Sequence, residues 1–191
     1  MFLQSLFGRL FELISSIENF SNTLDRLFYL NPDLKKCVID HCTPPHYSLI
    51  SIPPRNGSNN VLSSGGGTAF LVREPFTQLS TSVPDFSSFE SSSVTLQLSH
   101  SQLSVFNIYR PPSLSTYSKP FSVFLDDFSS FLSFAATTPH EFIITGDFNI
   151  HFDNPADTLT SQFLSLLSSF KILVNTFTSL RTIKTTFLIW S

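Results

Sequence analysis

The feature that most constrains the fold is a change in the spacing of apolar residues along the middle of the chain. Apolar and polar residues alternate over 94–98 and 103–109, and the short polar turn between these segments predicts a hairpin of two half-buried strands. From residue 121 the spacing becomes that of a helix, because Phe and Leu side chains recur on one face as far as residue 132. Ser118 is the expected N-cap of this helix, with Pro120 in its first turn.

The remaining segments extend this alternation of strands and helices. A short apolar strand is expected over 141–145, and a second helix with apolar positions from Leu159 to Phe170 is expected to begin near Asp157 and Thr158. Two earlier strands and an amino-terminal amphipathic helix are also expected, and the Ser-rich stretches are expected to be loops: strands 47–52 and 68–72, helix 2–20, loops 80–93 and 113–118. Strands interspersed with helices predict an α/β fold in which helices cover sheets.

The composition of the chain bears on its solubility and on its binding to DNA. The 191 residues fit one domain, but only 13% of them are charged, about half of the ~25% that is usual in soluble domains. Marginal solubility, or a fragment with exposed apolar faces, is therefore expected. The net charge of -3 provides no general basic field, so any DNA contact must be local.

The sequence also bears on cellular location. No apolar run reaches the roughly 18 residues of a membrane span, and Arg9 and Glu12 interrupt the apolar amino terminus, so we expect no membrane association and no signal peptide. Cys37 and Cys42 give no disulfide framework. A nuclear or cytoplasmic protein is expected, not a secreted one, and the oligomeric state is not predicted.

Polar residues follow two of the predicted strands and form a candidate site. Gly146-Asp147-Phe148-Asn149 stands directly after the strand at 141–145, and Tyr109 ends the strand at 103–109. On a sharp turn the Asp can accept a proton or help to hold a divalent cation, and the Asn amide can donate a hydrogen bond to an oxygen that gains charge. Because ligands bind beyond strand ends in open sheets, Tyr109, Asp147 and Asn149 are predicted to face one site. Each motif taken singly also fits an ordinary turn.

Three motifs occur in order, and together they resemble a known family. They are Gly65-Gly66-Gly67-Thr68-Ala69, Asn107-Ile108-Tyr109-Arg110-Pro111-Pro112 and Gly146-Asp147-Phe148-Asn149. The chain resembles the endonuclease/exonuclease/phosphatase superfamily over about residues 43–170, and more closely the apurinic-type endonuclease domain of non-LTR retrotransposons. The resemblance implies a partial four-layer α/β sandwich of the deoxyribonuclease I type. The three glycines by themselves are more typical of a turn than of a phosphate cradle, since no Lys-Ser/Thr follows them.

The same resemblance implies an activity and roles for three residues. The activity would be Mg²⁺-dependent nicking of target DNA beside a reverse transcriptase. Asp147 would orient or deprotonate the attacking water, Asn149 would contact the scissile phosphate, and Tyr109 would be the site tyrosine. Phosphodiester hydrolysis uses a metal to neutralise charge, a positioned water and donors to the nonbridging oxygens.

The chain departs from the family pattern at both ends. The family's early strand with an Asn and its metal-binding Glu are not recognisable in residues 1–42, where Glu12 and Glu18 stand in a helical context. We therefore expect a non-matching segment at 1–42 and a partial domain at 43–170. No residue is assigned as a metal ligand.

Residues 171–191 are expected to be an out-of-frame tail. Codons that encode residues 183–191 can be chosen so that a one-nucleotide shift reads D-K-N-H-I-L-D-L-V, which includes the family's L-D-L motif. A frameshift near Lys171 to Thr176 would account for this, and it would remove the family's catalytic His and the Asp that orients it. The genomic sequence of that stretch tests this hypothesis.

Two further groups of residues have ordinary interpretations. Cys37, His41, Cys42 and His46 offer metal-binding atoms, but structural zinc sites bring together two pairs from separated segments, so incidental residues of a connecting segment are expected instead. His151 follows the Asn149 turn and is expected to be a surface histidine.

The function predicted from sequence is a remnant of a Mg²⁺-dependent DNA endonuclease that has lost activity. Two alternatives stay open. The chain could be a noncatalytic interaction fragment or an untranslated relic, or it could be a phosphatase that acts on a small phosphorylated substrate with the same fold.

Overall fold

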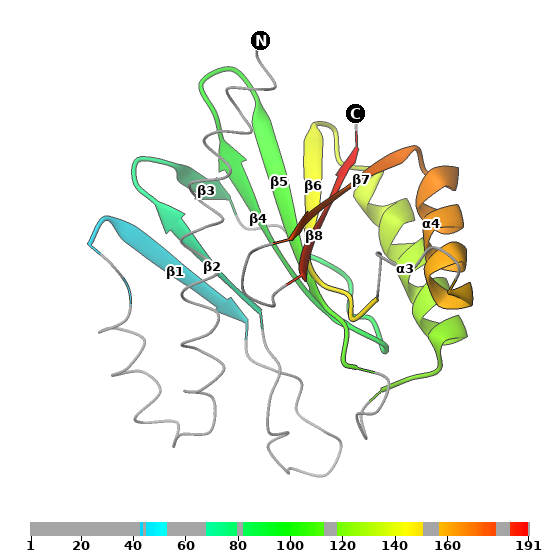
Figure 1. Ribbon diagram of the computed structural model, residues 1–191. Coiled ribbons are helices and arrows are strands. Elements are labelled where there is room, and N and C mark those ends of the chain that lie inside the picture. Colours follow the sequence, from blue (N-terminus) through cyan, green and yellow to red (C-terminus); the bar gives the residue numbers. More distant parts are fainter. Residues whose placement is uncertain are drawn as a thin grey trace, which may run out of the picture. The chain divides into compact units, whose positions relative to one another are not determined.

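The structure is a computed structural model, drawn in Figure 1, and it describes residues 43, 45–52, 68–79, 82–112, 118–150, 157–178 and 184–190. The chain divides into two compact units, residues 1–77 and 78–191.

The first unit contains an antiparallel pair of strands, β1 (Tyr47–Ile52) and β2 (Thr68–Arg73). The pairing runs from Tyr47 opposite Arg73 to Ile52 opposite Thr68. Phe70 and Val72 are buried, as expected for alternate residues on one face of a strand. Both predicted strands are confirmed.

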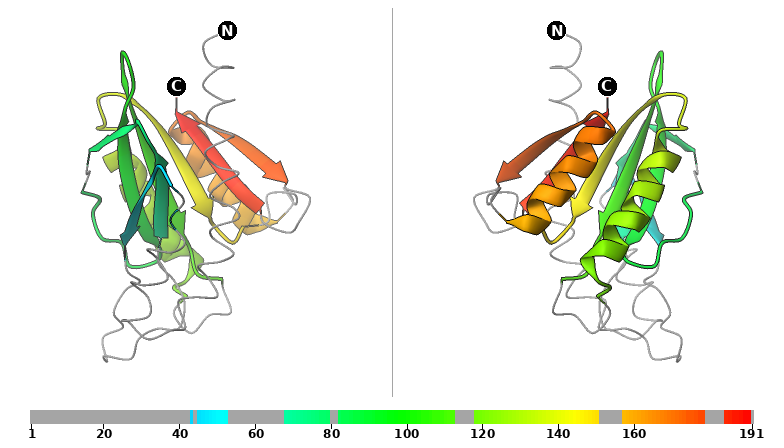
Figure 2. Two further views of the ribbon diagram at one scale, coloured as in Figure 1. Left: turned by 90° about the vertical axis from the view of Figure 1, so that its left-hand side faces the viewer. Right: turned by 90° about the vertical axis from the view of Figure 1, so that its right-hand side faces the viewer.

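The second unit is built on a six-stranded sheet with the order β3-β4-β5-β6-β8-β7. β5 and β6 run parallel, whereas β4–β5, β6–β8 and β7–β8 are antiparallel. The helices α3 and α4 lie on one face of this sheet, as the right-hand view of Figure 2 shows. The elements are β3 (Thr77–Leu79), β4 (Glu90–Gln97), β5 (Gln102–Tyr109), α3 (Phe121–Ala135), β6 (Glu141–Asp147), α4 (Thr158–Ser169), β7 (Ile172–Thr178) and β8 (Lys184–Trp190).

The core between the sheet and the helices is built largely from phenylalanine. The predicted apolar face of α3 is confirmed, because Phe124, Phe128 and Phe131 are all fully buried. Phe128 stacks on Phe124 with 5.4 Å between ring centroids and meets Phe163 of α4 at 5.1 Å. Ring pairs at such separations contribute about 0.5–1.5 kcal/mol each beyond the area that they bury. The many phenylalanines thus have a structural role as a continuous aromatic layer.

Helix α4 begins where the sequence predicted. Asp157 is its N-cap, and the Oδ2 atom of Asp157 accepts hydrogen bonds from the backbone N of Thr160 at 3.1 Å and from its Oγ1 at 3.2 Å. This satisfies one of the amide donors that a helix leaves without an internal partner.

Two local predictions were wrong. Strand β4 begins at Glu90, so the last residues of the expected loop 80–93 belong to a strand, where Ser92 pairs with Asn107 and is 1% exposed. The backbone pairing with β5 makes this segment a strand although its serine side chains contribute little apolar area. Ser118 does not cap α3: Pro120 is the N-cap without a side-chain hydrogen bond, and the Ser118 hydroxyl donates to the Lys119 carbonyl instead.

The predicted boundaries at residues 42 and 170 stay predictions. The expected helix at 2–20 lies outside the described residues. Within the expected tail at 171–191, the backbone forms β7 and β8, and Phe187 of β8 pairs with Thr145 of β6. Among the helices that the structure describes, none has both the length and the apolar character needed to cross a bilayer.

Candidate active site

The parallel pairing of β5 with β6 places Tyr109 directly opposite Asp147. Both residues are the last of their strands. Paired residues project to the same face, and neighbouring strands are about 4.8 Å apart. Tyr109 is partly buried and Asp147 is exposed. The structure therefore brings together the two strand ends that the sequence singled out, while their catalytic role stays a prediction.

Gly146 allows β5 and β6 to approach closely at this point. Its φ is +136°, a conformation that L side chains rarely adopt. A Cβ atom at Gly146 would collide with the carbonyl oxygen of Ile108 and would lie 2.7 Å from the Ile108 nitrogen. The glycine of the motif is thus required by the close approach of the neighbouring backbone.

The residues after Gly146 alternate between solvent and core. Phe148 is 2% exposed and packs edge-on against Phe128 with 5.7 Å between ring centroids, whereas Asp147 and Asn149 are exposed. The buried ring anchors the turn in the aromatic layer. The two polar side chains consequently stay at the surface on either side of it.

Hydrogen bonds fix the turn between Asp147 and Asn149. The backbone N–H of Asn149 donates to Oδ1 of Asp147 at 2.9 Å, and Asn149 has a φ of 49°. Asn tolerates this left-handed conformation better than most residues. The side-chain Nδ2 of Asn149 also donates to the carbonyl oxygen of Arg110 at 2.6 Å. Since a carboxamide nitrogen carries two N–H donors, this bond uses one of them.

Arg110 is a site component that the sequence analysis missed. It is only 3% exposed, and its Nη1 donates to the carbonyl oxygens of Phe148 at 3.1 Å and Asn149 at 3.2 Å. Its guanidinium carbon lies 5.1 Å from the ring centroid of Phe121 and 5.0 Å from that of Phe124. No sequence signal predicts this burial, because an Arg before two prolines is typical of an exposed turn.

The charge of Arg110 acts on the site. Burial lowers the pKa of the Arg110 guanidinium, and the negative charge of Asp147 acts in the opposite direction. Arginine has so high an intrinsic pKa that it stays protonated in proteins. Arg110 therefore places a positive charge near the Asp147 carboxylate.

A row of polar residues extends across the strands beside Tyr109. Glu90 of β4 pairs with Tyr109, which in turn pairs with Asp147, so all three project to one face of the sheet. The next row on that face, Ser92, Asn107 and Thr145, is polar too. Glu90 was not predicted as a site residue, because it falls within the loop expected at 80–93.

The described residues offer limited ligands for Mg²⁺. They include no group of three His, Cys, Asp or Glu side chains arranged to hold a metal ion. Glu90 stands two strands from Asp147, roughly 9.6 Å away by strand spacing. Mg²⁺ is usually bound by one or two carboxylates together with water and substrate phosphates, so Asp147 fits as one such carboxylate.

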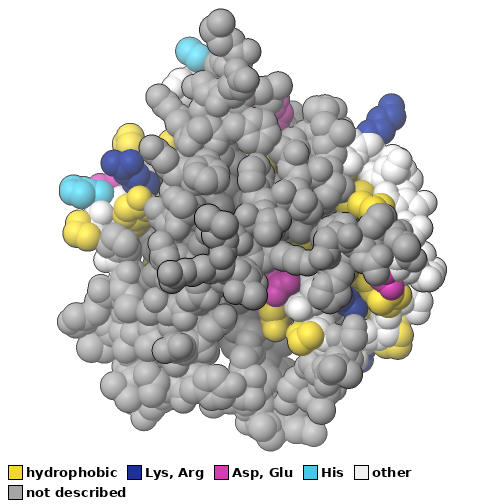
Figure 3. Space-filling model, viewed as in Figure 1, with side chains coloured by type: hydrophobic (Ala, Val, Ile, Leu, Met, Phe, Trp, Pro, Cys, Tyr) yellow, Lys and Arg dark blue, Asp and Glu magenta, His cyan; other side chains and the backbone are white. Residues whose placement is uncertain are grey.

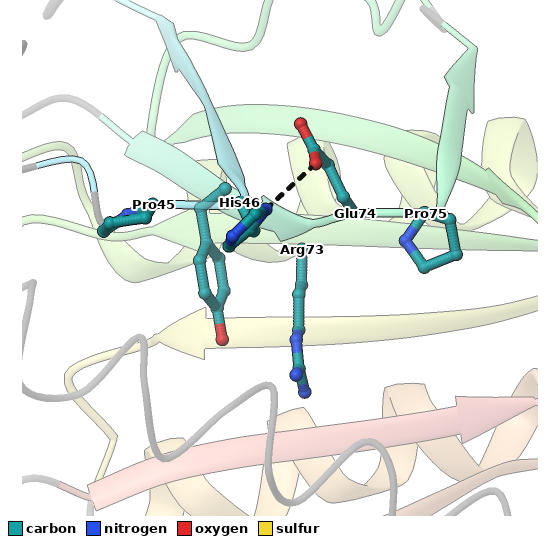
Figure 4. Close-up of a pocket in the computed structure, with 6 residues that line it drawn as sticks. Pro45, His46, Arg73, Glu74 and Pro75 are labelled. Atoms are coloured by element: carbon teal, nitrogen blue, oxygen red, sulfur yellow. Dashed lines mark ion pairs between the residues drawn. The ribbon is translucent and has the colours of Figure 1, made fainter.

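A separate open pocket of about 540 Å³ lies in the first unit. Figure 4 shows His46 and Glu74 pointing toward one another, and their Nδ1 and Oε2 atoms are 3.4 Å apart. Arg73 also lines the pocket, and it stands opposite Tyr47 in the pairing of β1 with β2. Because His46 and Glu74 are 79% and 65% exposed, their pairing contributes little. This pocket contains none of the three predicted site residues and is not the candidate active site.

Several residues weighed in the sequence lie outside the described residues. They are Gly65, Gly66, Gly67, Cys37, His41, Cys42 and His151.

Comparison with solved structures identifies the fold. The catalytic domain of human Nocturnin with a bound sulfate anion superposes with a TM-score of 0.51 at 13% identity, over 84% of this chain and 65% of that one. The endonuclease domain of TRAS1, a telomere-specific non-LTR retrotransposon, gives 0.50 at 12% identity, over 73% of this chain and 64% of that one. The chain thus has an α/β fold of the deoxyribonuclease I type, and it spans slightly less than two thirds of either structure.

The sequence comparison gives the family. The model of the endonuclease/exonuclease/phosphatase family matches residues 17–189, and the chain belongs to this family. The family resemblance stated from the three motifs is confirmed. A comparison with curated proteins returned no match.

Proposed function

We propose that the chain carries part of a Mg²⁺-dependent DNA endonuclease site that still engages a phosphodiester but no longer hydrolyses it efficiently. The observation that carries this proposal is the pairing of Tyr109 with Asp147 at the ends of β5 and β6, with Asn149 held in the adjoining turn. An acceptor, an amide donor and a phenol gathered at one sheet edge suit the recognition and hydrolysis of a phosphoester.

Each side chain has a role that follows from its surroundings. Asp147 is exposed and lies near the Arg110 cation, and its carboxylate can orient or deprotonate a water molecule. The second N–H of the Asn149 amide can donate to a nonbridging phosphate oxygen. Tyr109 can donate its hydroxyl proton to the same phosphate. When bound, Mg²⁺ would neutralise phosphate charge, with Asp147 as its carboxylate ligand from the described residues.

DNA is the substrate that the motif resemblance supports. The similar TRAS1 structure is an endonuclease domain, although likeness at 12% identity extends to the fold alone. The few charged side chains of the described residues that are visible in Figure 3 include both basic and acidic ones. We accordingly propose contact with a short stretch of DNA at this sheet edge. The alternative substrate is a small phosphorylated molecule, which the family description includes.

Weak hydrolysis is proposed because two parts of the family's machinery are not recognisable in the sequence. These are the metal-binding Glu and the catalytic His with its orienting Asp. Phosphoryl transfer depends on charge neutralisation and positioning together, so loss of either lowers the rate by orders of magnitude.

Binding of a short fluorescein-labelled DNA duplex, followed by anisotropy with and without Mg²⁺, tests the site. In EDTA, Asp147→Asn should tighten binding by about fivefold, because removal of a negative charge near a phosphate is worth on the order of 1 kcal/mol. Mg²⁺ should tighten binding by the wild type but not by Asp147→Asn. Asn149→Gly, which keeps the left-handed backbone accessible, should weaken binding by about tenfold.

Asp126→Asn is the matched control, because it removes the same charge from an exposed position on α3. The site proposal is refuted if Asp126→Asn and Asp147→Asn have equal effects, or if the wild type does not bind DNA. In a parallel assay, the wild type with Mg²⁺ should nick supercoiled plasmid no faster than Asp147→Asn. Nicking that depends on Asp147 would overturn the loss of activity, and hydrolysis of p-nitrophenyl phosphate without DNA binding would favour the small-substrate alternative.

A further inference from the structure

We infer that Arg110 is a positioning residue that sets the orientation of the Asn149 carboxamide and links it to helix α3. The effect of Arg110 on DNA binding rests on the proposed function. Its effect on the orientation of the Asn149 carboxamide can be tested without DNA. Arg110 touches no reacting atom in this arrangement. It acts through the turn that carries Asp147 and Asn149.

Four hydrogen bonds join Arg110 to the turn in both directions. The backbone N–H of Arg110 donates to the carbonyl of Asp147 at 2.9 Å, and its Nη1 donates to the carbonyls of Phe148 and Asn149. In return, the Arg110 carbonyl accepts the Nδ2 proton of Asn149 at 2.6 Å. The amide plane of Asn149 is thereby fixed at one end, which directs its second N–H away from Arg110.

The other side of the guanidinium packs on helix α3. The 5.1 Å and 5.0 Å separations from the rings of Phe121 and Phe124 are typical of cation–π contacts. Phe124 is fully buried, so this part of the helix cannot shift without disturbing the core. The rings therefore hold the planar guanidinium at a fixed place against the turn.

A left-handed turn at a surface needs such support. Asn149 has a φ of 49°, and its side chain is exposed, so packing against neighbours does not determine where the amide points. Burial of a charged side chain is costly unless its donors are satisfied. An apolar residue would fill the same space without holding either carbonyl, which indicates that the guanidinium serves the geometry of the turn.

NMR of the whole protein tests the structural part of this inference. The side-chain amide signals of Asn149 are assigned by their loss in Asn149→Gly, and their hydrogen exchange is then measured in Arg110→Met and Arg110→Lys. Met matches the length and apolar character of the arginine stem, so a role in filling space would leave exchange unchanged. A positioning role predicts that exchange rises at least ~10-fold in Arg110→Met, as the turn loses two charged donors, with part of the protection recovered in Arg110→Lys.

Phe131→Leu is the control for lost stability, because Phe131 is a fully buried residue of α3 that lies in the aromatic layer. This variant should lower the melting temperature and leave Asn149 protected. In the DNA-binding assay, Asn149→Gly should weaken binding about tenfold in the wild-type background but less than about twofold in the Arg110→Met background. Unchanged Asn149 exchange in Arg110→Met would overturn the inference. If Asn149 exchange rises in Arg110→Met but the wild type does not bind DNA, the proposed function is refuted and the positioning role of Arg110 stands.

Discussion

Replacement of Gly146 by alanine should weaken the fold at the point where the candidate site is formed. Gly146 lies in β6 with a φ of +136°, and an added Cβ would collide with the Ile108 carbonyl oxygen and lie 2.8 Å from the Ile108 carbonyl carbon. Ile108 is fully buried, and the atoms in question belong to its backbone. No rotation of a flexible side chain can relieve this contact, so β5 and β6 must separate locally.

The expected loss of stability follows from two contributions. A non-glycine residue held in a conformation of this kind costs about 1–3 kcal/mol. Separation of the strands also weakens one or two ladder hydrogen bonds, at about 1 kcal/mol each. Gly146→Ala should thus lower the free energy of unfolding by about 2–5 kcal/mol, which is a large share of the 5–15 kcal/mol typical of a domain.

Urea unfolding followed by circular dichroism measures this change. Thr145→Ala is the matched control, because Thr145 is the preceding residue of β6, is partly buried and pairs with Asn107. The control should cost less than about 1 kcal/mol. A loss below about 1 kcal/mol in Gly146→Ala would show that the β5–β6 approach at Ile108 is not as close as described, and the reasoning on the site would fail with it.

Two predictions concern carboxylates that hold loops or helix ends. Burial acts to raise the pKa of Asp127, but hydrogen bonds to its Oδ2 from the side chains and backbones of Ser88 and Ser87 outweigh this and lower the pKa below its ordinary 3.8. These hydrogen bonds therefore stabilise the fold fully above about pH 4, and their contribution is lost as pH falls through the lowered pKa of Asp127. In Asp127→Asn, the free energy of unfolding should fall less steeply as the pH is lowered from 5 to 2. An unchanged pH dependence in this variant would contradict the prediction. Asp157→Ala should cost about 1 kcal/mol in thermal unfolding by removing the cap of α4, whereas Asp157→Ser should retain most of it, and equal losses would rule out a capping role.

Local sequence pattern predicted the central elements well. The strands β5 and β6 and the helix α3 were confirmed because their apolar residues recur with the period of the element itself, and each element is long enough for the pattern to show. Phe124, Phe128 and Phe131, for example, fall on one face by spacing alone. Asp157 was recognised as a cap because capping depends on residues within one turn.

Elements without such a pattern were missed. β3 has only three residues, and the serines at the start of β4 have no apolar alternation of their own. The pairing of Ser92 with Asn107 is what makes this segment a strand. Strands β7 and β8 lie where the sequence predicted an out-of-frame tail. β8 pairs with β6, a partner distant in the chain, and β7 pairs with β8.

The sequence by itself determined which residues could form a site: Tyr109 at one strand end, and Asp147 and Asn149 on a turn after another. Only the tertiary structure decided that these strand ends are paired, that Gly146 must lack a side chain, and that Arg110 is buried against the turn. The physical reason is the distance along the chain between the residues that interact. Secondary structure and turns depend on neighbours along the chain, whereas strand pairing and the satisfaction of a buried charge depend on contacts such as that of Arg110 with Phe148, 38 positions apart.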